Sequence, residues 1–135
     1  MANNELKLSF ALPSLNEMLK AKGTMYGRSG SRRYSAYTAM KKKYMQAVEA
    51  ELIAQNCIPE KPFKAIDIEF VWMEAGRGRD PDNVRAGGAK FILDAMVNCG
   101  IMPDDSMKYV KHLADKFQKG KERGVIVKWT EYMER

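Results

Sequence analysis

The sequence contains few of the residues on which several common kinds of functional site depend. It has two cysteines, Cys57 and Cys99, and a single histidine, His112. A zinc site of Cys and His ligands needs more than these, and a Ser-His-Asp triad would have to use His112 without any nucleophile motif. Neither cysteine belongs to a CxxC pattern, so we expect a reduced cytosolic protein with buried thiols.

Long apolar runs and a recognisable targeting segment are also missing. No apolar run approaches the roughly 20 residues that a membrane helix needs, so no membrane partner is expected. The opening residues, MANNELKLSFALP, lack a basic stretch followed by an apolar core, which argues against a secretory signal. The hydrophobic content of 45% and charged content of 30% are those of a soluble globular protein, and 135 residues suit one domain, 1–135.

Acidic residues are absent from residues 20–43, which hold eight lysines and arginines. The net charge of the chain is +6, so its positive charge is concentrated in this segment. Glycines and serines predict a flexible loop in its first half, with tyrosines interleaved among the charges. We expect a basic arm that contacts phosphates, although a solvated loop without a role is the alternative. The residues predicted to bind DNA, in the arm and beyond it, are Lys20, Lys22, Arg28, Arg32, Arg33, Arg77, Arg79 and Arg85.

The pattern of apolar residues predicts an α+β fold. Strands are expected where apolar and polar residues alternate, at residues 5–12, 63–73 and 124–132, with a less regular one at 107–117. Helices are expected at residues 35–55, capped by Ser35 or Thr38, and from Ala89 to Cys99, where Gly100 stops the helix. Residues 13–19 are predicted to form a turn. Residues 83–88 are expected to be an irregular first turn, because Gly87 and Gly88 are poor helix formers. The chain therefore predicts a single domain with a small mixed β-sheet and two principal helices.

Residues 77–106 carry two acidic pairs in an otherwise basic chain. Asp80 and Asp82 flank Pro81, and an extended backbone would place both side chains on the same side. If they converge with Asp104 and Asp105, a hard cation such as Mg²⁺, or Mn²⁺ in its place, would relieve the repulsion. Such an ion polarises a phosphoryl oxygen and lowers the pKa of bound water. The alternative is structural: Asp82 caps the helix, and Asp104 and Asp105 form a turn.

The stretches RDPDN, KFILDAM and IMPDDS resemble the RusA family of Holliday-junction resolvases. The similarity covers about residues 80–106 and extends loosely to ALPSLNE near the N-terminus. It implies that Asp80, Asp82 and Asp105 bind a catalytic Mg²⁺, with Asp104 as support or a further ligand, and that Lys90 assists catalysis. The family's lysine follows the second aspartate by four residues. Here the separation is eight, with RAGG as an insertion, so Arg85 is the alternative for the basic role.

The resemblance also implies a homodimer whose two active sites nick opposed strands of a four-way DNA junction. The family occurs largely in bacteriophages and prophages, which places the expected activity in the cytoplasm of a bacterial host. The sequence thus predicts a Mg²⁺-dependent endodeoxyribonuclease that makes paired symmetric nicks by attack of metal-activated water on the phosphodiester. Two alternatives stay open: a non-catalytic binder of branched or single-stranded DNA, and a Mg²⁺-dependent phosphatase or nucleotide hydrolase with a DxD loop.

Overall fold

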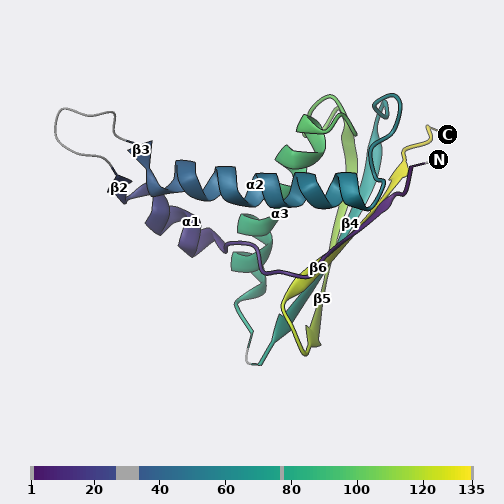
Figure 1. Ribbon diagram of the computed structural model, residues 1–135. Coiled ribbons are helices and arrows are strands. Elements are labelled where there is room, and N and C mark those ends of the chain that lie inside the picture. Colours follow the sequence, from purple (N-terminus) through teal and green to yellow (C-terminus); the bar gives the residue numbers. More distant parts are fainter. Residues whose placement is uncertain (1, 27–33, 77, 135) are drawn as a thin grey trace.

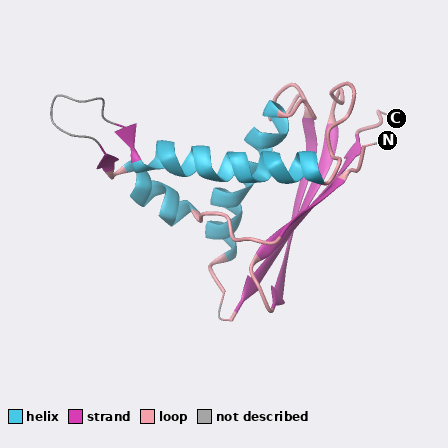
Figure 2. Cartoon of the chain, in the orientation of Figure 1, coloured by secondary structure: helices cyan, strands magenta, loops and turns pink. Residues whose placement is uncertain are grey.

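Four strands form one mixed sheet, and the helices lie on one side of it (Figures 1 and 2). The computed structural model describes residues 2–26, 34–76 and 78–134. The elements in chain order are β1 (Glu5–Leu8), α1 (Leu15–Lys22), β2 (Met25–Tyr26), β3 (Tyr34–Ser35), α2 (Ala36–Ala54), β4 (Ile66–Ala75), α3 (Pro81–Asn98), β5 (Val110–Gly120) and β6 (Gly124–Glu131). The predicted α+β class with a small mixed sheet is confirmed, with three helices in the described residues rather than two.

The sheet has the strand order β1-β6-β4-β5. β6 runs antiparallel to both β1 and β4, whereas β5 runs parallel to β4. A parallel neighbour requires a crossover connection, and α3 provides it. All four predicted strands are present with shifted ends. β1 stops at Leu8 instead of residue 12, and β4 covers residues 66–75 instead of 63–73.

The core lies between the helices and one face of the sheet. Residues that alternate along β4 meet those of β6 on this face: Phe70 lies beside Val127 and Trp72 beside Val125. These side chains are buried, as are residues on the facing sides of the helices: Val48, Leu52, Phe91, Ile92, Ala95 and Met96. The apolar residues that alternate along these two predicted strands therefore face the core, and the polar residues between them face away from it.

α1 corrects the prediction that residues 13–19 form a turn. Ser14 caps the helix, since its hydroxyl oxygen accepts a hydrogen bond from the backbone nitrogen of Glu17 at 3.2 Å. The Glu17 carboxylate accepts a bond from the same hydroxyl at 3.2 Å. Ser-x-x-Glu is the sequence signature of a helix start, so the chain carries a local signal for α1.

α3 begins at Pro81 and runs through both glycines without a break, so the irregular turn at 83–88 and the extended Asp80–Asp82 loop were wrong predictions. The reason is close packing. A Cβ on Gly87 would lie 2.4 Å from the carbonyl oxygen of Pro13, and one on Gly88 would lie 2.7 Å from the Trp72 ring. Contacts with α1 and the sheet therefore outweigh the helix propensity that two glycines cost, about 1 kcal/mol each.

The remaining predictions of helix ends are confirmed. Ser35 is the N-cap of α2, with its hydroxyl oxygen 3.3 Å from the backbone nitrogen of Thr38. Gly100 follows α3 with a φ of 80°, a conformation that glycine adopts readily. Among the described residues, the helices are all too short or too polar to span a bilayer.

Candidate functional site

The first acidic pair lies in the N-terminal turn of α3. Asp80 is the N-cap, and its Oδ1 accepts a hydrogen bond from the backbone nitrogen of Asp82 at 3.1 Å. The structural alternative had given the cap to Asp82. Both carboxylates are exposed at the positive end of the helix dipole. The Asp80 carboxylate is therefore held by the helix end, and both carboxylates are accessible from solvent.

The second acidic pair meets α3 at Lys90. The Lys90 Nζ lies 3.1 Å from Oδ1 of Asp94 and 3.7 Å from Oδ2 of Asp105. The pairing of Lys90 with Asp94, expected from their spacing, is present. The hydrogen bond that Lys90 donates to the Asp94 carboxylate raises the pKa of Lys90, and the charge of Asp105 adds to this effect. Lys90 consequently carries its positive charge throughout the neutral pH range.

The two acidic pairs are only partly brought together. Lys90 follows Asp82 by eight residues, about 12 Å along the helix axis. Across residues 2–26, 34–76 and 78–134, no three His, Cys, Asp or Glu side chains are gathered closely enough to hold a metal ion. Asp80, Asp82 and Asp105, with the exposed Asp104, offer the oxygen donors that Mg²⁺ prefers. The ligand chemistry therefore fits this ion, while the arrangement joins only Asp105 to Lys90.

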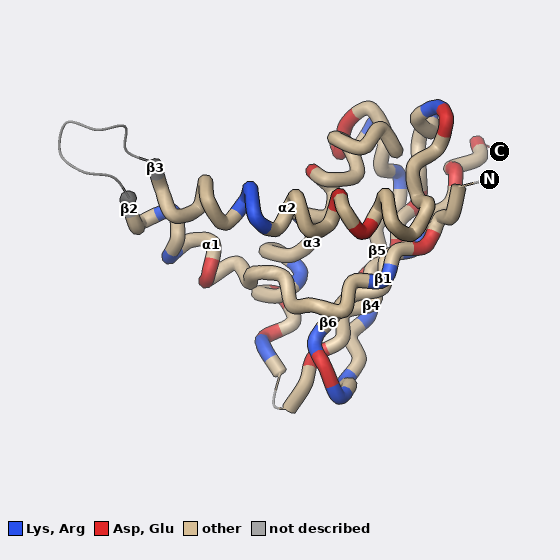
Figure 3. Tube along the Cα trace, viewed as in Figure 1, with Lys and Arg blue, Asp and Glu red and all other residues tan. Residues whose placement is uncertain are grey.

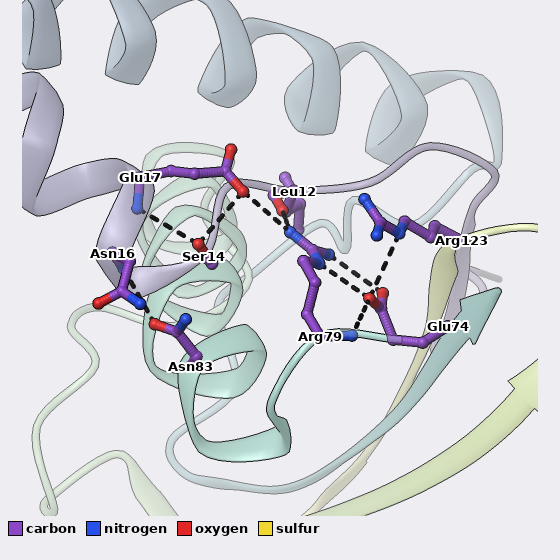
Figure 4. Close-up of polar contacts among 8 residues, drawn as sticks. All are labelled: Leu12, Ser14, Asn16, Glu17, Glu74, Arg79, Asn83 and Arg123. Carbon is purple, nitrogen blue, oxygen red and sulfur yellow. Dashed lines mark hydrogen bonds and ion pairs between the residues drawn. The ribbon is translucent and has the colours of Figure 1, made fainter. Parts of the chain in front are cut away.

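Arg79, which we predicted to contact DNA, is engaged inside the protein (Figure 4). Its guanidinium donates hydrogen bonds to the Glu74 carboxylate at 2.8 and 3.1 Å and to the carbonyl oxygen of Leu12 at 2.8 Å. Burial raises the pKa of Glu74, but the hydrogen bonds and charge of Arg79, helped by Arg123, outweigh burial and lower it. The residue that precedes Asp80 is thus anchored to β4 and to the segment before α1.

Asn83 connects the segment that carries the first acidic pair to the N-terminal segment. Its Oδ1 accepts a hydrogen bond from the backbone nitrogen of Asn16 at 2.9 Å, as Figure 4 shows. RDPDN and ALPSLNE, two of the stretches that enter the resemblance, therefore touch each other. No role was predicted for Asn83, although its place within RDPDN was a signal.

Arg85 lies on the side of α3 that faces β5. Its Nε is 2.6 Å from Oδ2 of Asp115, whose Oδ1 accepts a hydrogen bond from the Trp72 indole at 2.8 Å. Of the two candidates for the basic role, Lys90 is the one whose described ion pairs include a predicted metal ligand, Asp105. No signal in the sequence identified Asp115, because β5 was the least regular of the predicted strands.

The described part of the basic arm presents its lysines to solvent. Lys20 and Lys22 lie in the last turn of α1, with the Lys22 Nζ 4.7 Å from the centre of the Tyr37 ring. Figure 3 shows further lysines in the first half of α2, which are Lys41, Lys42 and Lys43. The other predicted DNA contacts, Arg28, Arg32, Arg33 and Arg77, lie outside the described residues.

No model of a protein family matches the chain, and no curated protein matches it. The functional assignment therefore depends on the residues and the arrangement described above.

Proposed function

We propose that this protein is a Mg²⁺-dependent endodeoxyribonuclease that resolves four-way DNA junctions by paired nicks. The observation that carries the proposal is the position of Asp105 beside Lys90, at 3.7 Å. The motif resemblance gives these two residues a joint catalytic role, although 14 residues separate them in the chain. In the structural alternative, the first acidic pair only caps a helix and the second only forms a turn. Neither role would require Lys90 and Asp105 to lie next to each other.

Asp80, Asp82 and Asp105 would hold the Mg²⁺, with Asp104 as support. A bound Mg²⁺ supplies a water of lowered pKa and polarises the phosphate. Lys90 would place its ammonium group next to the scissile phosphate and stabilise the charge that develops there. Arg79 keeps the loop before Asp80 in place through Glu74 and Leu12.

The basic surface supplies the affinity for DNA. The lysines of α1 and α2 lie near the end of the molecule that carries β2 and β3, which pair antiparallel with each other (Figure 3). Contacts of this kind bind the phosphate backbone without reading sequence and weaken as salt increases. A homodimer would present two such surfaces and two catalytic sites to the opposed strands of a junction.

A non-catalytic binder of branched DNA is the second candidate. It is favoured by the use of Asp80 as a helix cap and by the lack of a preformed group of three metal-binding side chains in the described residues. Such a protein would use the same basic surface. It would need neither acidic pair for DNA binding.

The deciding experiment compares a synthetic four-way junction with linear duplex DNA, in Mg²⁺ and in chelator. The nuclease should make paired symmetric nicks in the junction only, and chelator should abolish them. Asp80→Asn separates chemistry from folding, because asparagine is as good an N-cap as aspartate. This variant should keep its melting temperature and its junction affinity but lose cleavage, as should Asp82→Asn.

Asp80→Ala is the matched structural control, and it should lose both cleavage and about 1 kcal/mol of stability through the missing cap. Junction binding by the wild type without any cleavage in Mg²⁺ or Mn²⁺ would establish the binder instead. Hydrolysis of a small phosphate ester would point to a phosphatase.

A further inference from the structure

A cavity of about 360 Å³ lies between the first turn of α3 and the β4–β5 side of the sheet. Its apolar wall is formed by Trp72, Pro81, Val84 and Phe117, while Gln118 and Lys119 provide polar groups. This volume lies in the lower part of the range of small-ligand pockets, about 300–1,000 Å³. Phe117 is 45% exposed, although its register partner Trp72 is only 2% exposed. A large aromatic ring is therefore presented to solvent at the cavity.

The wall of this cavity is held firmly. The Trp72 ring stacks on Phe70 with centroids 5.3 Å apart, and its indole nitrogen donates to Asp115. Gly88 leaves no room for the ring to move toward α3, since even a Cβ there would be 2.7 Å away. Trp72 is almost fully buried, so it forms a fixed wall of the cavity, and the exposed Phe117 ring supplies the surface on which a flat ligand can stack.

The charges around the cavity favour a neutral ring attached to a phosphate. Glu74 also lines it, but Arg79 and Arg123 neutralise that carboxylate at 2.8 and 3.4 Å. Lys119 then contributes positive charge. Pro81 belongs to the wall and stands between Asp80 and Asp82, so the cavity adjoins the first acidic pair.

We propose that this cavity accepts one unpaired nucleobase of the branched DNA, stacked on Phe117. This inference rests on the proposed function, because the cavity would receive a base close to the phosphate that is cut. A branch point offers bases whose stacking is already weakened, which reduces the energy needed to extrude one. Stacking on an aromatic ring tolerates every base, so the cavity would select for branching rather than sequence.

The test uses a four-way junction with 2-aminopurine at the crossover, in Ca²⁺ so that binding is read apart from cleavage. The 2-aminopurine fluorescence should change when the wild type binds, as the base leaves the DNA stack for the protein ring. Phe117→Ala should abolish that change and weaken junction affinity by about 5- to 150-fold, the range expected for one base–aromatic stack. Phe117→Tyr should restore both.

Leu113→Ala is the matched control. Leu113 lies on the same strand and the same face, is 36% exposed and is not among the residues that line the cavity. This variant should bind like the wild type.

The possible outcomes separate the nucleobase site from the nuclease. Equal affinity and fluorescence of the wild type and Phe117→Ala would overturn the nucleobase site, whether or not the wild type cuts the junction. Sedimentation measures whether Phe117→Ala changes the oligomeric state. A change in oligomeric state with unchanged junction affinity and 2-aminopurine fluorescence would also refute the site, because Phe117 would then belong to a protein interface. A wild type that cuts nothing but shows the fluorescence change would refute the nuclease and leave the nucleobase site standing. Failure of the wild type to bind the junction would refute both.

Discussion

The backbone nitrogen of Asn16 lies 2.9 Å from Oδ1 of Asn83, a hydrogen bond between residues 67 positions apart. Asn16 is in the first turn of α1, where backbone N–H groups have no partner within the helix. Asn83 is in the first turn of α3, directly after Asp82. One side chain therefore satisfies a free donor of α1 and fixes the turn that carries the first acidic pair.

Replacement of Asn83 tests this connection. Asn83→Ala should lower the free energy of unfolding by about 0.5–1.5 kcal/mol, the net value of one intramolecular hydrogen bond. Asn83→Asp keeps an oxygen acceptor at the same place and adds a negative charge to the first turn, which the helix dipole favours. It should be as stable as the wild type. Urea denaturation of the three proteins measures the difference, and equal losses in both variants would mean that the acceptor is not what matters.

Gly87→Ala sets helix propensity against packing. Propensity alone predicts a gain of about 1 kcal/mol in this variant. The new Cβ would however meet backbone atoms of Pro13, Ser14 and Leu15 at 2.4–2.6 Å, and backbone cannot move aside as a side-chain end can. We expect a loss of about 1–3 kcal/mol in the free energy of unfolding.

Gly23→Ala is the control for that experiment. Its Cβ would lie at an ordinary 3.6 Å from the nearest atom, so stability should change by less than about 0.5 kcal/mol. Thermal and denaturant unfolding of both variants measure the effects. A more stable Gly87→Ala protein would mean that α1 and α3 do not approach each other this closely.

The strands and α2 were predictable because each has a local pattern long enough to be read alone. β6 alternates Val125, Val127 and Trp129 toward the core, and this period needs no knowledge of the rest of the fold. The start of α3 was not predicted because its stability depends on contacts with α1 and the sheet, whereas α1 was missed although the Ser14 and Glu17 cap is a local signal. The glycines that weaken α3 locally are the ones that let α1 and the sheet pack against it.

In the candidate site, too, contacts between residues close in sequence were predictable, and contacts that depend on the fold were not. Lys90 and Asp94 are four residues apart, so their pairing followed from helix geometry. Arg79 and Arg85 looked like free cations for DNA because their main partners, Glu74 and Asp115, are on strands β4 and β5. The pairing of each arginine with its carboxylate depends on how the chain folds. It cannot be predicted from the composition of the sequence.

The Glu74–Arg79 pair should make stability depend on pH. The pKa of Glu74 is lowered in the folded protein, so its contribution is full above the unfolded pKa, about 4.3, and is lost as the pH falls through the folded value. Glu74→Gln should therefore melt below the wild type at pH 7, and the gap should close below about pH 4. Glu60→Gln, at an exposed position, should show no such trend. A gap that stays constant from pH 7 to pH 3 would show that Glu74 acts by packing rather than by charge.

Lys90 should restrain metal binding even as it assists catalysis. Its ammonium group lies 3.7 Å from Asp105, so under the proposed function it competes with Mg²⁺ for the same carboxylate. Lys90→Met should lower the Mg²⁺ concentration for half-maximal cleavage by up to about fivefold, the value of a partly exposed ion pair. Its maximal rate should fall by about 100-fold, because the charge that stabilises the reacting phosphate is gone.

Lys41→Met distinguishes this competition from a general change in charge. Lys41 pairs with Asp94 at 3.7 Å, the same aspartate that holds Lys90, but has no ion pair with Asp105 among the described residues. Its loss removes an equal charge from the neighbourhood and should leave the Mg²⁺ dependence almost unchanged. Cleavage rates measured against Mg²⁺ concentration for both variants give the answer. If Lys90→Met and Lys41→Met shift the half-maximal concentration equally, Asp105 is not a ligand of the catalytic ion, and the second acidic pair has to be assigned to the turn alone.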